Sequence, residues 1–174
     1  LEHRRQRQMC IRDREINLTY LSIGSNIGDR TKNLSNSLLE IENKIGNIVC
    51  KSKIYETEPW GYKYQDFFLN QVIQVETYLI PETLLDTCKL IESKMGRKVN
   101  KKWRERIIDV DILYFNNSII KKNNLLIPHQ FLHDRKFILK PLNDIAPTFL
   151  HPKLLKTTKN LLNDCIDKST VYAI

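Results

Sequence analysis

Hydrophobic and polar positions alternate along the chain in a way that predicts strands and helices in turn. Residues 16–23 (INLTYLSI) form an apolar, β-branched run that favours a strand, and Gly24-Ser25-Asn26 then interrupts it. From residue 29 or 30 to about residue 45, apolar positions recur at helical spacing, and Gly46 is a natural end for that helix. The chain therefore opens as strand, turn and helix.

Two further strands, a second helix and a fourth strand follow. Residues 48–57 and 67–77 favour strands, separated by a loop rich in Pro, Gly and Tyr at residues 58–66. A helix at residues 81–95 has Pro in its first turn and Gly just past its end, and the fourth strand lies within RERIIDVDILYF, residues 104–115. The order β-α-β-β-α-β predicts an α+β, ferredoxin-like (split βαβ) core, a mainly antiparallel sheet with helices packed on one face.

The C-terminal part adds smaller elements to this core. Asn116-Asn117 predicts a tight hairpin turn into a strand at residues 118–121, and LLIPH, residues 125–129, is also strand-like. From Asp134 onward the sequence favours short helices. The prolines expected to interrupt them are Pro141, Pro147 and Pro152. We expect an extra C-terminal hairpin with short helices, within one domain over residues 15–174.

Composition favours a soluble globular protein. Of 174 residues, 41% are hydrophobic and 28% charged, and no apolar run approaches the roughly 18 to 20 residues of a membrane helix. Residues 1–14 hold five Arg but lack the apolar centre of a secretory signal, so we treat them as a non-native or disordered leader. The four cysteines show no C-x-x-C pairing, which favours reduced thiols and a cytoplasmic location. The net charge of +8 suits nucleic acid or a small polyanion such as a nucleotide.

Two acids interrupt the fourth strand. Asp109 and Asp111 point to one face of it, with Cβ atoms about 6 to 7 Å apart. That face could simply be solvated, as in many one-sided sheets, but Ile107, Leu113 and Phe115 are expected to share it. A partly buried acid pair requires cations, and the candidates are the nearby arginines or one or two divalent metal ions that also bind substrate phosphates.

Other candidate motifs have ordinary explanations beside functional ones. The basic segment at residues 101–106, which surrounds Trp103, is either a solvated charge run or a phosphate-binding element beside the acids. Gly24-Ser25-Asn26 is either a simple turn or a set of N–H groups for an anion. His129 and His133 lack the further ligands of a zinc site. Aromatic residues such as Phe68 and Phe137 are by default core residues.

Seven segments, taken together, resemble the 6-hydroxymethyl-7,8-dihydropterin pyrophosphokinase (HPPK) family of folate biosynthesis. They are LSIGSNIGDR (21–30), YETEPWG (55–61), DFFLNQV (66–72), Gly96-Arg97, RERIIDVDIL (104–113), IPH (127–129) and DRKFILKPLNDIAP (134–147). The resemblance covers roughly residues 17 to 166. It implies transfer of the pyrophosphoryl group of ATP to the hydroxymethyl oxygen of the dihydropterin, giving AMP and the pterin diphosphate. It also implies a cytoplasmic enzyme, which we expect to be a monomer with no nucleic-acid or membrane partner.

The resemblance also implies roles for individual residues. Asp109 and Asp111 would bind two Mg²⁺, and with Arg97 and Arg106 they would form the catalytic set. The residues that would bind ATP are Arg97, Trp103, Arg106, His129 and Arg135. The residues that would bind the pterin are Thr57, Glu58, Trp60, Phe68, Asn70 and Phe137, with the two phenylalanines stacking on its rings.

The sequence departs from the family pattern at two places. Lys102-Trp103-Arg104-Glu105-Arg106 stands where the family has Arg-Trp-Gly-Pro-Arg, so the Gly-Pro turn is missing and the geometry of this loop is open. Val99 or Asn100 stands where the family has a basic residue after Arg97. The altered loop leaves open an inactive family member, and the ferredoxin-like architecture leaves open an RNA-binding module.

Overall fold

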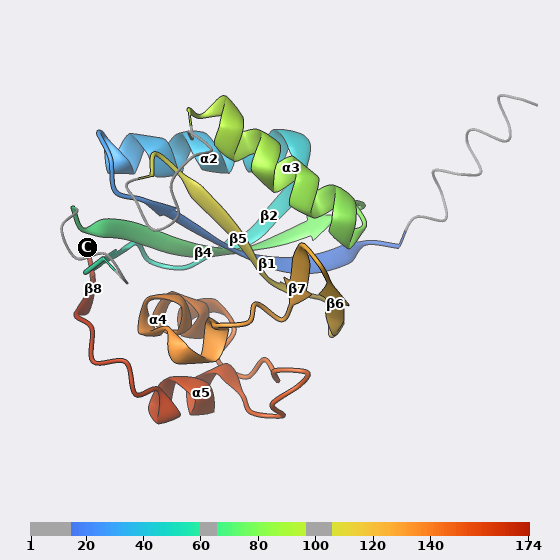
Figure 1. Cartoon of the computed structure of the whole chain (residues 1–174), viewed down its shortest axis with the longest axis vertical. Coiled ribbons are helices and arrows are strands. Elements are labelled where there is room, and N and C mark those ends of the chain that lie inside the picture. Colours follow the sequence, from blue (N-terminus) through green and yellow to red (C-terminus); the bar gives the residue numbers. More distant parts are fainter. Residues whose placement is uncertain (1–14, 60–65, 97–105) are drawn as a thin grey trace, which may run out of the picture.

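A computed structural model of the chain describes residues 15–59, 66–96 and 106–174, and the expected leader at residues 1–14 lies outside this part. Figure 1 shows a central sheet with helices on both of its faces. The protein is therefore a mixed α/β structure, and the mainly antiparallel sheet predicted from the sequence is confirmed.

Six strands form the central sheet, in the order β5-β1-β4-β3-β8, with β2 also paired to β4. Every strand pair in it is antiparallel. The strands are β1 (Asn17–Ser25), β2 (Gly46–Lys51), β3 (Tyr55–Thr57), β4 (Phe68–Thr77), β5 (Asp109–Phe115) and β8 (Val171–Ala173). Strands β1 and β4 occupy the centre, so the residues on either side of them are brought together across the sheet.

The sequence predicted one strand at residues 48–57. This prediction is wrong in one respect, because the structure has two strands there. β2 and β3 pair with opposite ends of β4, and Ser52 lies at the break between them. The N–H of Ser52 donates to the carbonyl of Val72 at 2.9 Å, and its Oγ accepts from the N–H of Val72 at 3.0 Å. The serine hydroxyl therefore takes the place of a main-chain partner, which lets the strand break without leaving a buried N–H unpaired.

Helices cover both faces of the sheet, whereas the sequence predicted one covered face. α2 (Arg30–Lys44) and α3 (Pro81–Lys94) lie on one face, and α4 (Lys136–Ile145) and α5 (Thr158–Asp164) lie on the other (Figure 1). A 3₁₀ turn, η1 (Leu132–Asp134), precedes α4. Pro141 lies inside α4 and does not end it, contrary to expectation.

Two apolar clusters correspond to the two faces. The larger cluster joins the sheet to α2 and α3, and the smaller one joins it to α4 and α5. In β5, Val110 and Ile112 belong to the larger cluster and Leu113 to the smaller one. A register shift in the pairing of β1 with β5 then places Phe115 in the larger cluster. The prediction that Phe115 shares the face of Asp109 is therefore wrong, because the irregularity changes the alternation of side chains.

The C-terminal elements differ from expectation in their pairing. The strand after Asn116-Asn117 exists as β6 (Ile120–Lys122), but it pairs with β7 (Leu125–Ile127) and not with β5. Asn116 has a φ of 47°, so a turn does occur there. The hairpin predicted between the acid-bearing strand and residues 118–121 is therefore wrong, and the hairpin that forms joins β6 to β7, with its tip at residues 123–124.

Strand β8 was not predicted, and it extends the sheet beyond β3. Lys140 of α4 donates from its Nζ to the carbonyl of Val171 at 2.7 Å. The hydroxyl of Tyr55 donates to the carboxylate of Asp144 at 3.0 Å, which anchors the end of α4 to β3. These contacts fix α4 against the sheet. Among the described residues, the structure contains no helix long and apolar enough to span a bilayer.

Candidate active site

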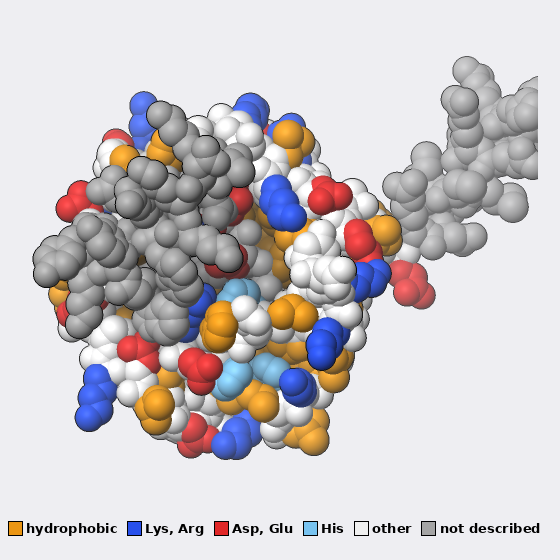
Figure 2. All heavy atoms as spheres, viewed as in Figure 1, with side chains coloured by type: hydrophobic (Ala, Val, Ile, Leu, Met, Phe, Trp, Pro, Cys, Tyr) orange, Lys and Arg blue, Asp and Glu red, His pale blue; other side chains and the backbone are white. Residues whose placement is uncertain are grey.

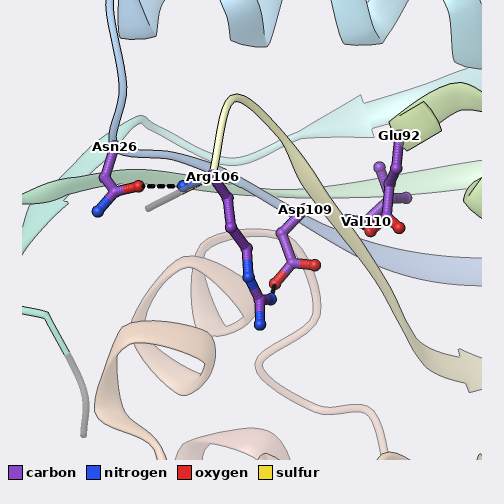
Figure 3. Close-up of polar contacts among 5 residues, drawn as sticks. All are labelled: Asn26, Glu92, Arg106, Asp109 and Val110. Atoms are coloured by element: carbon purple, nitrogen blue, oxygen red, sulfur yellow. Dashed lines mark hydrogen bonds and ion pairs between the residues drawn. The ribbon is translucent and has the colours of Figure 1, made fainter. Parts of the chain in front are cut away.

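Asp109 and Asp111 lie where β5 begins, at one end of the sheet. Both are half-buried, and they alternate with Val110 and Ile112, which are buried in the cluster under α2 and α3. The two carboxylates therefore point to the opposite face, the one covered by α4. The guanidinium of Arg106 forms an ion pair with Asp109, and Figure 3 shows these two side chains pointing toward each other. The predicted acid pair and one of its predicted cations are thus brought together.

The turn after β1 holds the backbone of Arg106. The N–H of Asn26 donates to the carbonyl of Arg106 at 3.0 Å, and the Oδ1 of Asn26 accepts from the N–H of Arg106 at 2.7 Å (Figure 3). The Gly24-Ser25-Asn26 turn was singled out in the sequence only as a turn or an anion site. Its link to the segment before β5 connects residues 80 positions apart, and no local pattern in the sequence could show it.

Glu92 of α3 is buried and reaches the backbone between the two aspartates. Its Oε1 accepts from the N–H of Val110 at 2.8 Å, as Figure 3 shows. Because β5 pairs with β1 on its other side, this carboxylate takes the place of a neighbouring strand. Glu92 was not predicted from the sequence. The signal was there, since Glu92 is four residues after Cys88 on the apolar stripe of the helix.

Arg135, which the family resemblance assigns to ATP binding, lies close enough to both aspartates to interact with their charges. The residue is only 9% exposed, and burial lowers the pKa of its guanidinium while the charges of Asp111 and Asp109 raise it. An arginine stays protonated in a protein at neutral pH. The site therefore balances two carboxylates with two guanidinium groups, those of Arg106 and Arg135, which is the cationic company that the acids required.

His129 lies beside β5, close enough to Asp109 and Arg135 to interact with their charges. Its N–H donates to the carbonyl of Leu113 at 3.0 Å. Burial and the nearby charge of Arg135 lower the pKa of His129 to about 4, while Asp109 raises it. The imidazole is therefore neutral at pH 7. Its Nδ1 accepts from the N–H of Phe131 at 3.3 Å, so the proton lies on Nε2, which is the donor available to a ligand.

Figure 2 shows histidine side chains, in pale blue, near the middle of one face of the molecule with basic and acidic side chains beside them. The two histidines considered for zinc face different neighbours. The ring of His129 is 6.2 Å from that of Phe131, and the ring of His133 is 6.3 Å from that of His151. Within residues 15–59, 66–96 and 106–174, the structure shows no group of three or more metal-binding His, Cys, Asp or Glu side chains.

The predicted pterin residues on β3 and β4 lie on the same face as the aspartates. Asn70 and Thr57 are buried, and the Nδ2 of Asn70 donates to the Oγ1 of Thr57 at 2.6 Å. Phe68 is half-buried, pairs with Thr57 in the sheet and is two residues from Asn70. These three side chains therefore form one group, polar at Asn70 and apolar at Phe68.

One row of the sheet joins this group to the aspartates. Asp109 pairs with Gly24 of β1, and Gly24 pairs with Asn70 of β4. Asp109 and Asn70 are thus two strands, about 10 Å, apart on one face. A Cβ added at Gly24 would lie 2.6 Å from the Oδ1 of Asn70. Glycine therefore keeps the surface between the two residues open.

Arg135 and Phe137 lie at the start of α4, which covers this face of the sheet. The guanidinium carbon of Arg135 lies 4.9 Å from the ring centroid of Phe131 and 5.8 Å from that of Phe137. Glu58 is exposed at the far end and accepts from the Oγ1 of Thr170 at 2.7 Å. Three predicted site residues lie outside the described part of the chain. They are Trp60, Arg97 and Trp103.

Comparisons with known proteins show which family the chain belongs to. The sequence model of the family described as 7,8-dihydro-6-hydroxymethylpterin-pyrophosphokinase (HPPK) matches residues 20–147. A relative from Aquifex aeolicus, named 2-amino-4-hydroxy-6-hydroxymethyldihydropteridine pyrophosphokinase, is 39% identical over 140 residues, which are 80% of this chain and 87% of the relative. The relative of that name from Methylorubrum extorquens is 39% identical over 74% of this chain and 82% of its own length.

Some relatives are much longer. The Dictyostelium discoideum folic acid synthesis protein FOL1 is 43% identical over 83% of this chain, but the match spans only 22% of that protein. A crystal structure of a Plasmodium falciparum HPPK-DHPS mutant has a TM-score of 0.71 at 22% identity and covers 87% of this chain and 44% of its own, which supports the fold. From the matched residues and the bacterial relatives, the chain belongs to the 7,8-dihydro-6-hydroxymethylpterin-pyrophosphokinase family.

Proposed function

We propose that the chain transfers the pyrophosphoryl group of ATP to 6-hydroxymethyl-7,8-dihydropterin, as the names of its relatives describe. The observation that carries this proposal is the sheet row Asp109–Gly24–Asn70. It has carboxylates and guanidinium groups at one end, an amide beside an aromatic ring at the other, and a glycine between them. Such a row suits a polyphosphate and a flat heterocycle held next to each other.

The phosphate end suits magnesium together with ATP. Mg²⁺ prefers oxygen ligands and is commonly held by one or two carboxylates plus substrate phosphates, so a larger set of protein ligands is not needed. Asp109 and Asp111 supply such oxygens from one face of β5. We propose that they hold two Mg²⁺, which would supply charge neutralisation and orient the phosphates when bound.

The protein's own side chains then act by placement and electrostatics. The guanidinium groups of Arg106 and Arg135 would bind phosphate oxygens, and the neutral His129 would donate from Nε2 to the nucleotide. Arg97 and Trp103 are proposed to contact ATP on the basis of the family pattern. No protein nucleophile is required, because the attacking oxygen belongs to the substrate.

The pterin end would recognise a planar ring by shape and hydrogen bonds. Phe68 on the sheet and Phe137 on α4 are proposed to stack on its two faces, and Asn70, already oriented by Thr57, would pair with its polar edge. Glu58 and Trp60 complete this proposed set.

The chemical balance is simple. A bond forms between the hydroxymethyl oxygen and the β-phosphorus of ATP, and the bond from that phosphorus to the oxygen bridging to the α-phosphate breaks. The hydroxyl proton is released, and AMP and the pterin diphosphate leave. Holding the two reactants in line and neutralising the charge on the phosphates are the two contributions that such a site can supply.

The strand order supports the ferredoxin-like assignment. A split βαβ core has its fourth strand beside the first and its third strand between the first and second. The order β5-β1-β4 followed by β2 and β3 fits this description if β2 and β3 count as one broken strand. The C-terminal helices and β8 are then additions to that core.

The remaining proposals concern the protein's setting. We propose a cytoplasmic, monomeric enzyme without a nucleic-acid partner. Exposed aromatic residues on the central strands would favour RNA binding, but Tyr20 of β1 is buried. Sedimentation of the full chain checks the monomer.

One assay tests the reaction. The chain is incubated with ATP, Mg²⁺ and 6-hydroxymethyl-7,8-dihydropterin, and AMP is measured with and without the pterin. Pterin-dependent AMP is expected. ADP in place of AMP, or no pterin-dependent turnover, would exclude the proposal, and the second result would favour an inactive member of the family.

A further inference from the structure

A single buried amide, that of Asn26, connects the two ends of the site. Its Oδ1 accepts from the N–H of Arg106 at 2.7 Å, and its Nδ2 donates to the carbonyl of Asp66 at 3.2 Å. The main-chain N–H of Asn26 also donates to the carbonyl of Arg106 at 3.0 Å. Arg106 lies just before β5 and Asp66 just before β4. Asn26 itself follows β1, the strand between them. Three hydrogen bonds therefore tie the starts of the phosphate-end and pterin-end strands to the central strand.

These bonds are unusual for an asparagine in a turn. Such a residue ordinarily bonds to backbone one or two positions away and stays at the surface. Asn26 is 1% exposed, and its side chain bonds to residues 40 and 80 positions away. Its buried polar atoms are thus used for long-range placement. Losing them would leave the amide of Arg106 and the carbonyl of Asp66 without these partners.

Arg106 is consequently held at both ends. Asn26 fixes its main chain, and Asp109 forms an ion pair with its guanidinium. Figure 3 shows the three residues in that order. A long side chain can place its charge on a phosphate only if its Cα is fixed, because each free torsion spreads the guanidinium over several positions.

We propose that Asn26 is a positioning residue, which sets the guanidinium of Arg106 against the phosphates and holds the start of β4 in place for the pterin. This inference rests on the proposed function and adds to it a residue that contacts neither substrate. It acts through Arg106 and Asp66, so its effects must depend on them.

The first test replaces Asn26 with alanine in the full chain. Asn26→Ala should lower kcat by about ten- to a hundredfold, because small misplacements of a charge-stabilising group have effects of that size. The matched control is Asn33→Ala. Asn33 bonds to Ser25 and Ile27 in the same turn, but not to Arg106 or Asp66, so kcat should change by less than about threefold. Equal losses in both variants would overturn the proposal.

A double-mutant cycle separates positioning from a general effect on folding. In an Arg106→Ala background there is no guanidinium to place, so adding Asn26→Ala should reduce kcat by less than about a further threefold. If the fold loss in kcat of the double variant equals the product of the fold losses of the two single variants, Asn26 does not act through Arg106.

The isosteric variant Asn26→Asp separates the contact with Arg106 from the contact with Asp66. It also replaces the alanine variant as the test if Asn26→Ala does not fold. Aspartate keeps an oxygen that accepts from the N–H of Arg106 but, when ionised, loses the donor to Asp66. It should raise the KM for the pterin about tenfold and change the KM for ATP by less than about threefold. Equal changes in the KM for the pterin and the KM for ATP, or no change in either, would show that Asn26 does not hold the start of β4 for the pterin.

A spectroscopic measurement keeps this inference separate from the proposed reaction. The guanidinium ¹⁵N–¹H signals of Arg106, assigned by their loss in Arg106→Ala, should be protected from exchange in the wild type and in Asn33→Ala but exchange freely in Asn26→Ala. Unchanged protection in Asn26→Ala would overturn the positioning role. If the wild type forms no AMP, the proposed reaction fails, and these signals alone still decide whether Asn26 holds Arg106.

Discussion

The two faces of the central sheet differ in what they contain, although the same strands supply both. On the face under α2 and α3, Ile23, Ile73 and Val110 are buried in a continuous apolar cluster. On the opposite face, the strands carry apolar residues at one end and polar ones, including Asp109 and Asn70, at the other. Because side chains alternate along a strand, one residue can pack in the apolar core while its neighbour faces the candidate site. Substitutions on the two faces should therefore separate the free energy of unfolding from turnover.

The largest expected effect is on the polar face, at Asp111. Asp111→Asn should lower kcat by about a hundredfold or more, because it removes half of the carboxylate pair while keeping the shape of the side chain. The melting temperature should hardly change. Pterin-dependent AMP release and thermal denaturation check the two halves of this prediction. Asp164→Asn, at an exposed ion pair with Lys156, is the control and should have wild-type kcat.

The apolar face should respond in the opposite way. Ile73 is fully buried, and Ile73→Ala should lower the free energy of unfolding by about 2 to 5 kcal/mol through lost burial and a cavity. Turnover per folded molecule should stay near the wild-type value at low temperature. Urea denaturation gives the first quantity and AMP release the second. A large fall in kcat with unchanged stability would show that the two faces are not independent.

Glu92 lies between these extremes, because it is buried on the apolar side yet supports the acidic strand. Glu92→Ala leaves the N–H of Val110 without this acceptor and should cost about 1 to 3 kcal/mol of stability. Glu92→Gln keeps an acceptor oxygen and should lose less. Urea denaturation compares the two variants. A greater loss in the glutamine variant would argue against the hydrogen bond as the cause.

His129 gives the polar face a dependence on pH. Its pKa is about 4 in the folded protein, below the value of about 6.5 expected in the unfolded chain. Between these values the unfolded chain binds more protons, so the contribution is present above pH 6.5 and is lost as the pH falls toward 4. The loss should be on the order of 3 kcal/mol. Denaturation curves of the wild type and His129→Gln should converge over this window, and parallel curves would contradict the assignment.

The smallest change tests the open surface between the two ends of the site. Gly24→Ala places a Cβ against the Oδ1 of Asn70, which must move or turn. The KM for the pterin should rise by about tenfold, equivalent to about 1.4 kcal/mol, with a smaller effect on the KM for ATP. Steady-state kinetics with each substrate varied in turn would show this. Equal KM values in variant and wild type would mean that Asn70 does not read the pterin.

Much of this site could be predicted from the sequence, because its polar residues break local patterns. Asp109 and Asp111 interrupt an apolar strand, and the family resemblance then suggested His129 and Arg135 as ATP-binding residues. Both of these lie close enough to Asp109 to interact with its charge. Glu92 was missed although it also breaks a pattern, that of a helical apolar stripe. A charged residue on a buried face therefore indicates a specific partner in a helix as much as in a strand.

Local sequence alone determined the helices α2 and α3, the long strands and the side of β5 on which the two acids lie, because spacing of 3.6 or 2 residues fixes which side chains share a face. Other features depended on the tertiary structure. The break between β2 and β3, the shifted register that moves Phe115, the pairing of β6 with β7 and the addition of β8 all arise from contacts between distant segments. The role of Asn26 is of the same kind, since its partners are 40 and 80 residues away. Periodicity describes only the residue's own neighbourhood, whereas hydrogen bonds of this kind are decided when the chain closes on itself.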